Sequence, residues 1–424
     1  MTTSFLLGAG ASVDAGLPMS TGLTRDIIAQ LAPIHHGSRP VLQFVTGVLL
    51  AERGRQGNNP LDGIDVEEVM TALDLLANRK NLEISPFVGA WDHGVGHFDQ
   101  SAVTSRDAEN AIGKIFNFSQ PSFSDGKPLI ELIRNIAGMS STGANYRRAR
   151  EASIATLITV LQDHEDVSYL KPIFRLADSQ THCTVATLNY DRTLEDAAYE
   201  SDVRMDTGID HWTSNGEWSF NNDAPVHLLK LHGSIDWIEE DIHTDALPEA
   251  RFRTRRDDDQ FPNFRGVRPG MIFGGANKLR ADGPYLELLS RWEDVLTSSD
   301  NLIVVGYSFR DDHINEILRR WVNRGPHRRM VVIDPEARDL RQFGKTNFIS
   351  QLQQDLLGEQ GWSSSAAEHP PRHYRLIQLA HSAQSGLPIA LSLIDDDAAD
   401  IWEPPSSRDA FETMQERVKA LSTG

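Results

Sequence analysis

Several segments of this sequence place small or polar residues immediately after a short apolar run. The first follows Phe5–Leu7 and is rich in glycine and alanine. Glycine lets backbone N–H groups approach a phosphate, and the N-terminus of a following helix favours negative charge. This pattern predicts a phosphate-binding turn, although such a turn can also serve only to reverse a strand tightly. The residues of the predicted turn are Gly8, Ala9, Gly10, Ala11, Ser12, Gly16 and Pro18.

Two later segments carry an amide, a carboxylate and an imidazole. Asn189 and Asp191 follow an apolar run that ends at Thr187, and His232 follows the run 226–231. Imidazole titrates near neutral pH, which makes His232 a candidate acid or base. The alternative is that the histidine only binds a backbone carbonyl and that Asp191 only begins a helix.

Two further strand ends add to the set. The run 302–305 is followed by Gly306 and Ser308, which suit contact with a ribose or phosphate. Asp311 and Asp312 come next, and at least one of them is expected to cap the following helix. Asp334 follows the run 330–333, where a carboxylate could read a nucleoside hydroxyl or an adenine edge. Ligands of parallel sheets bind beyond the carboxyl ends of the strands, so these residues are expected to surround one ligand.

Alternating strand and helix patterns position these segments. Helices are expected over 192–199, 284–296 and 312–322, and further short strands over 235–238 and 270–273. This alternation predicts an α/β fold, a Rossmann-like parallel sheet with helices on both faces.

A long helical block interrupts the alternation. Residues 35 to 175 show helical periodicity over 41–51, 65–76, 128–137 and 146–161, around an irregular stretch at 82–126. We interpret the block as an insertion in a catalytic domain of residues 1–345. Residues 346–424 are expected to form a C-terminal extension, with an amphipathic helix over 408–421, that packs on the domain or on another subunit.

Composition restricts the function classes. Lys and Arg total 41 and Asp and Glu total 60, and the net charge of −19 argues against unaided binding of nucleic acid or anionic membranes. The basic stretch 251–256 is offset by the acids at 257–259. Cys183 is the only cysteine, which excludes an internal disulfide and a cysteine-based zinc site. Without a run of 18 apolar residues or a signal peptide, a cytoplasmic protein is expected.

These segments carry a family resemblance. In chain order, the turn at 8–18, Thr-Leu-Asn-Tyr-Asp at 187–191 and Leu-His-Gly at 231–233 resemble the three signature blocks of the sirtuin family. The sequences of residues 230–237 and 305–315 are similar to those of the bacterial sirtuin-like branch found in anti-phage defence. The same holds for Asp-Val-Glu-Glu-Val at 65–69. The resemblance spans roughly residues 4 to 340.

The resemblance implies a role for each matching residue. The turn at 8–12 would cradle the pyrophosphate of NAD+, Asn189 and Asp191 would hold the nicotinamide ribose and the attacking group, and His232 would be the catalytic histidine. Gly306 and Ser308 would line the dinucleotide site, and Asp334 would lie near the adenosine.

One departure from the family guides the expected reaction. Protein-deacylating sirtuins carry two Cys pairs that bind a structural zinc, whereas this chain has one cysteine. We therefore expect neither a zinc ribbon nor a bound metal. Water is the expected nucleophile. The expected enzyme is an NAD+ hydrolase that releases nicotinamide and ADP-ribose and depletes NAD+ in abortive-infection defence. A deacylase, an ADP-ribosyltransferase and a non-catalytic nucleotide sensor remain as alternatives.

Self-association and control by a partner are also expected. The helical insertion and the tail lie outside the segments needed for one cofactor-binding domain. The insertion also carries an apolar stripe that another subunit could cover. Packing within the insertion is the alternative. An NAD+-depleting enzyme needs restraint, so we expect a separately encoded partner, for example an ATP-driven translocase. The stripe comprises Ile154, Leu157, Val160 and Leu161.

Overall fold

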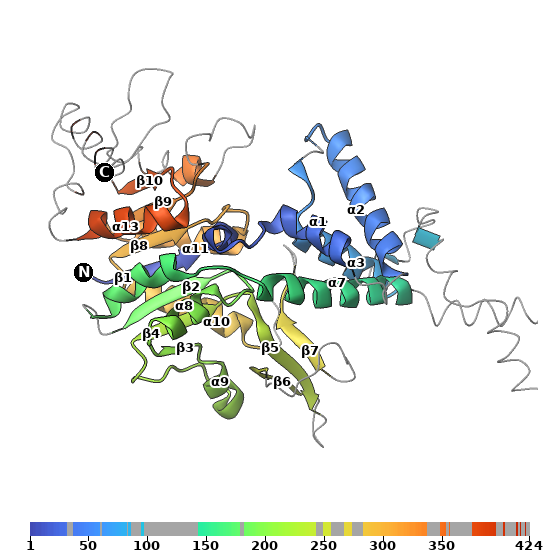
Figure 1. Cartoon of the computed structure of the whole chain (residues 1–424), viewed down its shortest axis with the longest axis horizontal. Coiled ribbons are helices and arrows are strands. Elements are labelled where there is room, and N and C mark those ends of the chain that lie inside the picture. The colour runs from blue at the N-terminus through green and yellow to red at the C-terminus, as the bar shows by residue number, and fades with distance from the viewer. Residues whose placement is uncertain are drawn as a thin grey trace, which may run out of the picture. The chain divides into compact units, whose positions relative to one another are not determined.

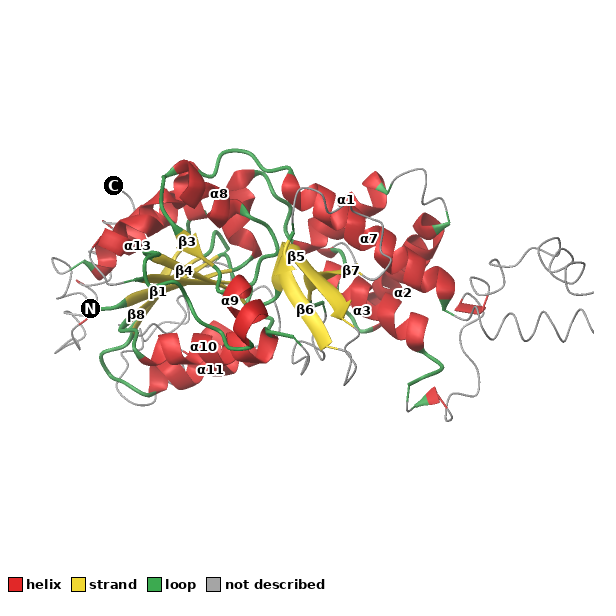
Figure 2. Cartoon of the chain, turned by 90° about the horizontal axis from the view of Figure 1, so that it is seen from below, coloured by secondary structure: helices red, strands yellow, loops and turns green. Residues whose placement is uncertain are grey.

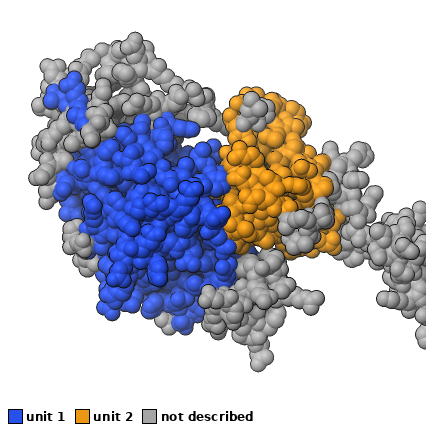
Figure 3. Space-filling view, in the orientation of Figure 1, with its two compact units in different colours: residues 1–19, 161–424 blue, residues 20–160 orange. Residues whose placement is uncertain are grey.

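The chain forms two compact units, residues 1–19 with 161–424 and residues 20–160 (Figure 3). Each is described by itself. The predicted helix over 128–137 lies outside the described residues, as do most residues of the predicted helix over 408–421 and of the irregular stretch 82–126. The computed structural model describes residues 1–31, 37–59, 62–82, 84–85, 95–96, 143–178, 182–242, 249–255, 267–273, 283–336, 348–352 and 375–395, and residues 356, 402, 413, 416 and 420.

A seven-stranded parallel sheet forms the centre of the first unit (Figure 1). The strand order is β10-β9-β8-β1-β2-β4-β3, and every neighbouring pair is parallel. This confirms the predicted α/β, Rossmann-like fold. The strands are β1 (Thr3–Leu7), β2 (Cys183–Thr187), β3 (Met205–Asp206), β4 (Val226–Lys230), β8 (Asn301–Val305), β9 (Arg329–Ile333) and β10 (Leu376–Leu379).

Helices cover both faces of this sheet, because successive strand side chains point to opposite sides. Phe5 and Leu7 enter one hydrophobic core and Leu6 enters the other. Figure 2 shows α8 and α13 on one side of the sheet and α10 and α11 on the other. The first core includes residues of η1 (Ala9–Ala15), η5 (Ser168–Asp178), α8 (Thr193–Glu200) and α13 (Ala383–Ile394), and the second includes residues of α10 (Tyr285–Thr297) and α11 (Asp312–Asn323).

A small antiparallel sheet branches from the end of β4. Its order is β6-β5-β7, so the strands predicted at 235–238 and 270–273 pair with each other and lie outside the parallel sheet. Gly233 has a φ of 85°, and a Cβ there would lie 1.9 Å from the Gly270 carbonyl oxygen, so only glycine permits this close approach. The strands are β5 (Gly233–Ile242), β6 (Glu249–Thr254) and β7 (Val267–Met271), and the short helix α9 (Ile209–Asn215) precedes β4.

The C-terminal part of the chain completes the main sheet. Residue 345, the predicted end of the catalytic domain, falls between β9 and β10, which are parallel neighbours. Helix α13 buries Leu387 and Leu393 in the same core as β1. Residues 375–395 therefore belong to the same compact unit as the main sheet.

The second unit is helical in the part that the structure describes. Helix α3 buries Val69, Met70 and Leu73, in agreement with the helical periodicity over 65–76, and the Asp65 carboxylate caps it by accepting from the Glu67 N–H at 2.8 Å. This unit starts at residue 20 and ends at residue 160, whereas the predicted insertion ran from 35 to 175. The helices are α1 (Ser20–Gln30), α2 (Ser38–Arg55), α3 (Val66–Asn78) and α7 (Ala144–Gln162).

The apolar stripe of α7 is covered within the chain. Ile154, Leu157, Val160 and Leu161 are each at most 9% exposed. The alternative weighed above therefore describes this stripe, and its apolar face gives no reason for self-association.

Candidate active site

The strand register brings the predicted segments to one level. Leu7 pairs with both Thr187 and Val305, Thr187 pairs with Lys230, and Val305 pairs with Ile333. The residue that follows each of these strand ends therefore lies along the same edge of the sheet. This is the edge at which ligands of parallel α/β sheets bind.

Ser12, Asn189 and Asp191 form one hydrogen-bonded group at this edge. The Asn189 side-chain amide donates to the Gly8 carbonyl oxygen at 2.9 Å and to Ser12 Oγ at 3.0 Å. The Ser12 hydroxyl donates to Asp191 Oδ2 at 2.8 Å. All three side chains are at most 8% exposed. The sequence prediction that these distant segments meet is therefore correct for this group.

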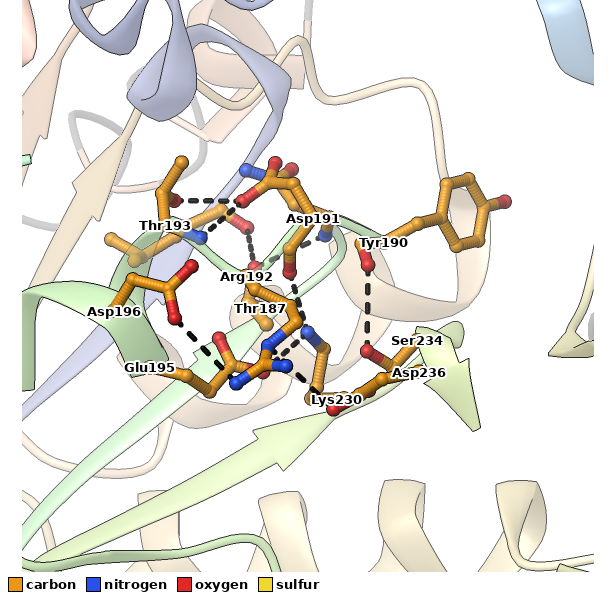
Figure 4. Close-up of polar contacts among 12 residues, drawn as sticks. Thr187, Tyr190, Asp191, Arg192, Thr193, Glu195, Asp196, Lys230, Ser234 and Asp236 are labelled. Atoms are coloured by element: carbon orange, nitrogen blue, oxygen red, sulfur yellow. Dashed lines mark hydrogen bonds and ion pairs between the residues drawn. The ribbon is translucent and has the colours of Figure 1, made fainter. Parts of the chain in front are cut away.

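Asp191 also holds the start of α8. Its other carboxylate oxygen, Oδ1, accepts the Thr193 N–H at 3.0 Å and the Thr193 hydroxyl at 2.7 Å (Figure 4). Both oxygens are thus engaged by the protein. The helix-starting role that was the alternative for Asp191 is real, and it coexists with the contact to Ser12.

The glycine turn packs against the end of β8. The N–H groups of Gly8 and Gly10 donate to the Val305 and Gly306 carbonyls, each at 2.9 Å, and the Ala11 N–H donates to the Gly8 carbonyl at 2.8 Å. A Cβ on Gly8 would lie 2.6 Å from the Gly306 oxygen. These glycines therefore serve the close approach of two backbones, and these three N–H groups are not available to a phosphate in this conformation.

Other predicted residues of the turn have varied surroundings. The Ala11 carbonyl accepts the Tyr169 hydroxyl at 2.7 Å, and burial together with the nearby Asp191 carboxylate raises the pKa of Tyr169, which keeps this donor protonated. Gly16 ends η1 with a φ of 82°. Ala9 is exposed and Pro18 is half-buried.

His232 pairs with a carboxylate from a distant strand end. Its Nε2 lies 3.2 Å from Asp311 Oδ2, and its Nδ1 is buried without a hydrogen-bond partner among the described residues. Because β4 and β8 are separated in the sheet by β1 and β2, this pair spans the ends of two intervening strands. The main chain of His232 is fixed as well, since its carbonyl accepts the Ile272 N–H at 3.1 Å.

Asp311 is held in place from several sides. Its Oδ1 caps α11 by accepting the His313 N–H at 3.2 Å, while its Oδ2 faces His232. The Tyr307 hydroxyl lies 3.2 Å from the Asp311 main-chain nitrogen and 3.1 Å from Asn315 Oδ1. Between them, Phe309 has a φ of 55°, a conformation that non-glycine residues rarely adopt. The loop after β8 is therefore tightly specified around this carboxylate.

Three other predicted residues have different surroundings. Ser308 is exposed, and Asp334 accepts the Glu336 N–H at 2.9 Å. Thr187 supports the site from below, because its hydroxyl accepts the Asn189 N–H at 3.1 Å.

Two residues at this edge are not among the predicted site residues. The sequence indicates only a capping role for Asp311, which both caps α11 and faces His232. Lys230 could be found by one signal, since a lysine within an otherwise apolar strand is unusual. Its side chain is fully buried.

Among the described residues, no helix is long and apolar enough to cross a membrane. In the same part of the chain, no group of three or more His, Cys, Asp or Glu residues could hold a metal ion. Cys183, the only cysteine, is buried in the first core, and burial raises the pKa of its thiol to about 12.

Comparison with known families adds a further observation. Residues 184–353 match the family model described as a SIR2-like domain. This supports the sirtuin-like resemblance. The matched region contains Asn189, Asp191, His232 and Asp311, and it excludes the glycine turn at 8–18.

Solved structures give weaker similarities. An ADP-ribose complex of a mutant Sir2 homologue is 10% identical, with 92% of this chain and 90% of that chain covered and a TM-score of 0.39. A complex of a Sir2 homologue with NAD is 12% identical, with 95% and 90% covered and a TM-score of 0.34. Comparison with curated proteins found no match.

Proposed function

We propose that the chain is an NAD+ hydrolase that cleaves the bond between nicotinamide and ribose. The SIR2-like match over residues 184–353 supports an NAD+-using enzyme, and the ordered motifs at 8–18, 187–191 and 231–233 support the same substrate. The observation that carries the proposal is His232, a buried imidazole with a carboxylate at one nitrogen and, within the part of the chain that the structure describes, no hydrogen-bond partner at the other.

The His232–Asp311 pair supplies the base. When Nε2 is protonated, its N–H donates a hydrogen bond to Asp311. Nδ1 is then unprotonated and can accept a proton. In the proposed reaction the bond between nicotinamide and C1′ of the ribose breaks, and nicotinamide leaves as a neutral molecule. Water adds to C1′ and loses one proton, directly or through a ribose hydroxyl, to His232. The balance is NAD+ and water giving nicotinamide, ADP-ribose and one proton.

Asn189 positions the sugar in this proposal, and Asp191 holds the segments around it. Two acceptors hold the Asn189 side-chain nitrogen, so its amide plane is fixed before substrate arrives. Both Asp191 oxygens are engaged by Ser12 and Thr193, so Asp191 acts by holding the turn and α8. The proposed dinucleotide site further includes Gly306, Ser308 and Asp334.

We further propose that NAD+ depletion serves anti-phage defence and is switched on by a separately encoded partner. This rests on the wording of 230–237 and 305–315, which is similar to the defence branch. NAD+ should fall in infected cells that express the parent chain and stay constant with His232→Ala. Homo-oligomerisation stays a prediction, to be checked by light scattering for a mass several times 47.2 kDa.

The decisive test uses purified protein and NAD+ without any acyl-lysine peptide or protein acceptor. Equimolar release of nicotinamide and ADP-ribose is the expected result. Release that requires an acyl-lysine peptide would identify a deacylase, and transfer of ADP-ribose to a protein would identify a transferase. Binding of NAD+ without any product, with and without the triggering partner, would identify a sensor.

A further inference from the structure

Lys230 is a fully buried cation that contacts the Asn189–Asp191 segment. It is the last residue of β4, and its side chain is 0% exposed. Its ammonium donates to the Asp191 main-chain carbonyl oxygen at 2.6 Å and to Glu195 Oε1 at 2.7 Å (Figure 4). One buried side chain therefore joins the strand end, the segment at 189–191 and helix α8.

The surroundings make this lysine unexpected on stability grounds. Val226 and Leu228, which point to the same face of β4, belong to the hydrophobic core. Removing an ammonium from water costs several kcal/mol, and an apolar pair of similar volume is often equally stable. Burial raises the pKa of Glu195, and the Lys230 charge opposes that shift. A packing role alone does not explain why this position carries a charge.

The two contacts of Lys230 act on the residues that organise the site. The carbonyl it holds belongs to Asp191, whose carboxylate binds Ser12. The Asn189 amide binds the same serine. Fixing the Asp191 main chain from below therefore fixes the direction of both side chains above it.

Helix α8 is tied to the same point. Glu195 lies in its first turn, and Thr193 at its start binds Asp191 from above. Arg192 forms two further ion pairs nearby, with Asp196 at 3.5 Å and with Asp236 at 3.7 Å. Lys230 is buried, whereas Arg192 is exposed.

We propose that Lys230 is a positioning residue, which holds the Asn189–Asp191 segment through the Asp191 carbonyl and couples it to α8 through Glu195. Its consequence for NAD+ cleavage rests on the proposed function, whereas the tether itself does not. Lys230 acts through Asp191 and does not reach the substrate.

The test removes both charges together. Lys230→Met with Glu195→Leu preserves volume and leaves no unpaired buried charge, so the fold should be retained. Hydrogen–deuterium exchange of peptides covering 188–194 should become faster than in the parent. The kcat for NAD+ cleavage should fall about 10²-fold through misplacement of Asn189, with the melting temperature within a few degrees of the parent.

A second ion pair that involves α8 provides the matched control. Lys171 of η5 and Glu200, the last residue of α8, form an exposed ion pair at 3.3 Å. Lys171→Met with Glu200→Leu should change neither exchange at 188–194 nor kcat. The single change Glu195→Gln keeps an acceptor for Lys230 and its contact with Asp191, so it should keep most of the activity.

Each outcome decides the proposal. Unchanged exchange at 188–194 in the double variant would overturn the tether, and faster exchange with parental kcat would overturn its role in positioning. If the double variant fails to fold, a kcat loss of about 10²-fold in a folded Glu195→Gln protein would overturn the role of the Asp191 carbonyl, and retained activity would support it. A parent without NAD+ cleavage would refute the proposed function, and exchange would then judge the tether alone.

Discussion

His232 and Asp311 belong to strand ends that are not neighbours in the sheet, and their contact defines the proposed base. Asp311 makes two contacts through separate oxygens: Oδ2 faces the His232 imidazole, and Oδ1 caps the first turn of α11. Asparagine caps a helix almost as well as aspartate. It lacks the negative charge that the contact with the imidazole needs.

Asp311→Asn should therefore leave the fold intact and lower kcat. Losing the carboxylate removes the charge that stabilises the imidazolium, and a decrease of about 10²-fold is expected for disrupted acid–base catalysis. Steady-state NAD+ cleavage and thermal melting measure the two effects. Asp312→Asn is the matched control, because Asp312 is exposed on the same helix turn and the charge change is equal. Equal kcat values for the two variants would remove Asp311 from the mechanism.

The sequence predicted the residue types of the site better than their contacts. Asn189, Asp191 and Ser12 stand out because each follows a strand, and parallel strand ends meet at one edge. The pairing of His232 with Asp311 depends on how far two loops extend across the ends of β1 and β2, which no local pattern encodes. Whether the Gly8 and Gly10 amides face a ligand or another backbone also depends on the β8 turn.

At the scale of elements, the turns after β1 and β8 are in backbone contact. Gly306 has a φ of 60°, and a Cβ there would lie 2.3 Å from the Ala11 nitrogen. Neither turn can move away without breaking the hydrogen bond from the Gly10 N–H to the Gly306 carbonyl. Glycine is required at both turns for packing as well as for conformation.

Gly306→Ala should destabilise the protein by about 1–3 kcal/mol, because the left-handed conformation and the close contact both penalise a Cβ. Gly47→Ala should have the opposite sign. Gly47 lies exposed in α2, and beyond its own helix turn no described residue has an atom within 4 Å of an added Cβ, so alanine should stabilise that helix by about 0.5–1 kcal/mol. Urea unfolding of both variants measures the difference. Similar midpoints for the two proteins would refute the packing argument.

The opposite end of β4 carries a ring stack with a pH dependence. His227 is stacked between Phe220 and His182, with centroid distances of 4.3 Å and 4.4 Å, and no described residue bonds its Nε2. Burial, helped by nearby His182, lowers the pKa of His227 below its ordinary 6.5. The folded state therefore resists protonation more than the unfolded state does.

Stability should fall as the pH drops below 6.5, because His227 then binds a proton more readily in the unfolded chain than in the folded chain. Above that pH the imidazole is neutral in both states and the contribution is constant. His227→Phe should flatten this part of the stability profile, measured by melting temperature against pH. His211→Gln, at an exposed histidine, should leave the profile unchanged. A parental slope in His227→Phe would contradict the assignment.

Element prediction succeeded where the pattern was local and long. The runs that became β1, β2, β4, β8 and β9 are apolar and adjacent to turn residues, and all lie in the sheet. The two-residue strand β3 and the four-residue strand β10 are too short to stand out. Helix α13 contains Gly386 and Pro388, which are unfavourable inside helices, and its burial against the sheet compensates for them.

For the whole molecule, the sheet unit depends on its C-terminal part. Strand β10 pairs with β9 through all four of its residues, and α13 covers the core that β1 enters. Trp402 packs in the same core and donates its indole N–H to the Leu393 carbonyl at 2.7 Å. The main sheet is therefore assembled from both ends of the chain.

A chain that ends at residue 345 should fail to fold, because it lacks β10, α13 and Trp402. A chain that ends at residue 403 retains all three and should melt cooperatively near the parental temperature. Circular dichroism and thermal melting of the two proteins provide the comparison. Cooperative melting of the shorter chain near the parental temperature would show that the C-terminal segment is dispensable to the sheet.

The most direct test of the account is nicotinamide release from saturating NAD+ by the parent and by His232→Ala, each supplied with any triggering partner the parent needs. The parent should release nicotinamide and ADP-ribose in equal amounts. His232→Ala should keep its melting temperature and lose at least about 10²-fold in kcat, because it lacks the proton acceptor at Nδ1. Cleavage by His232→Ala within a few-fold of the parent would contradict the central claim.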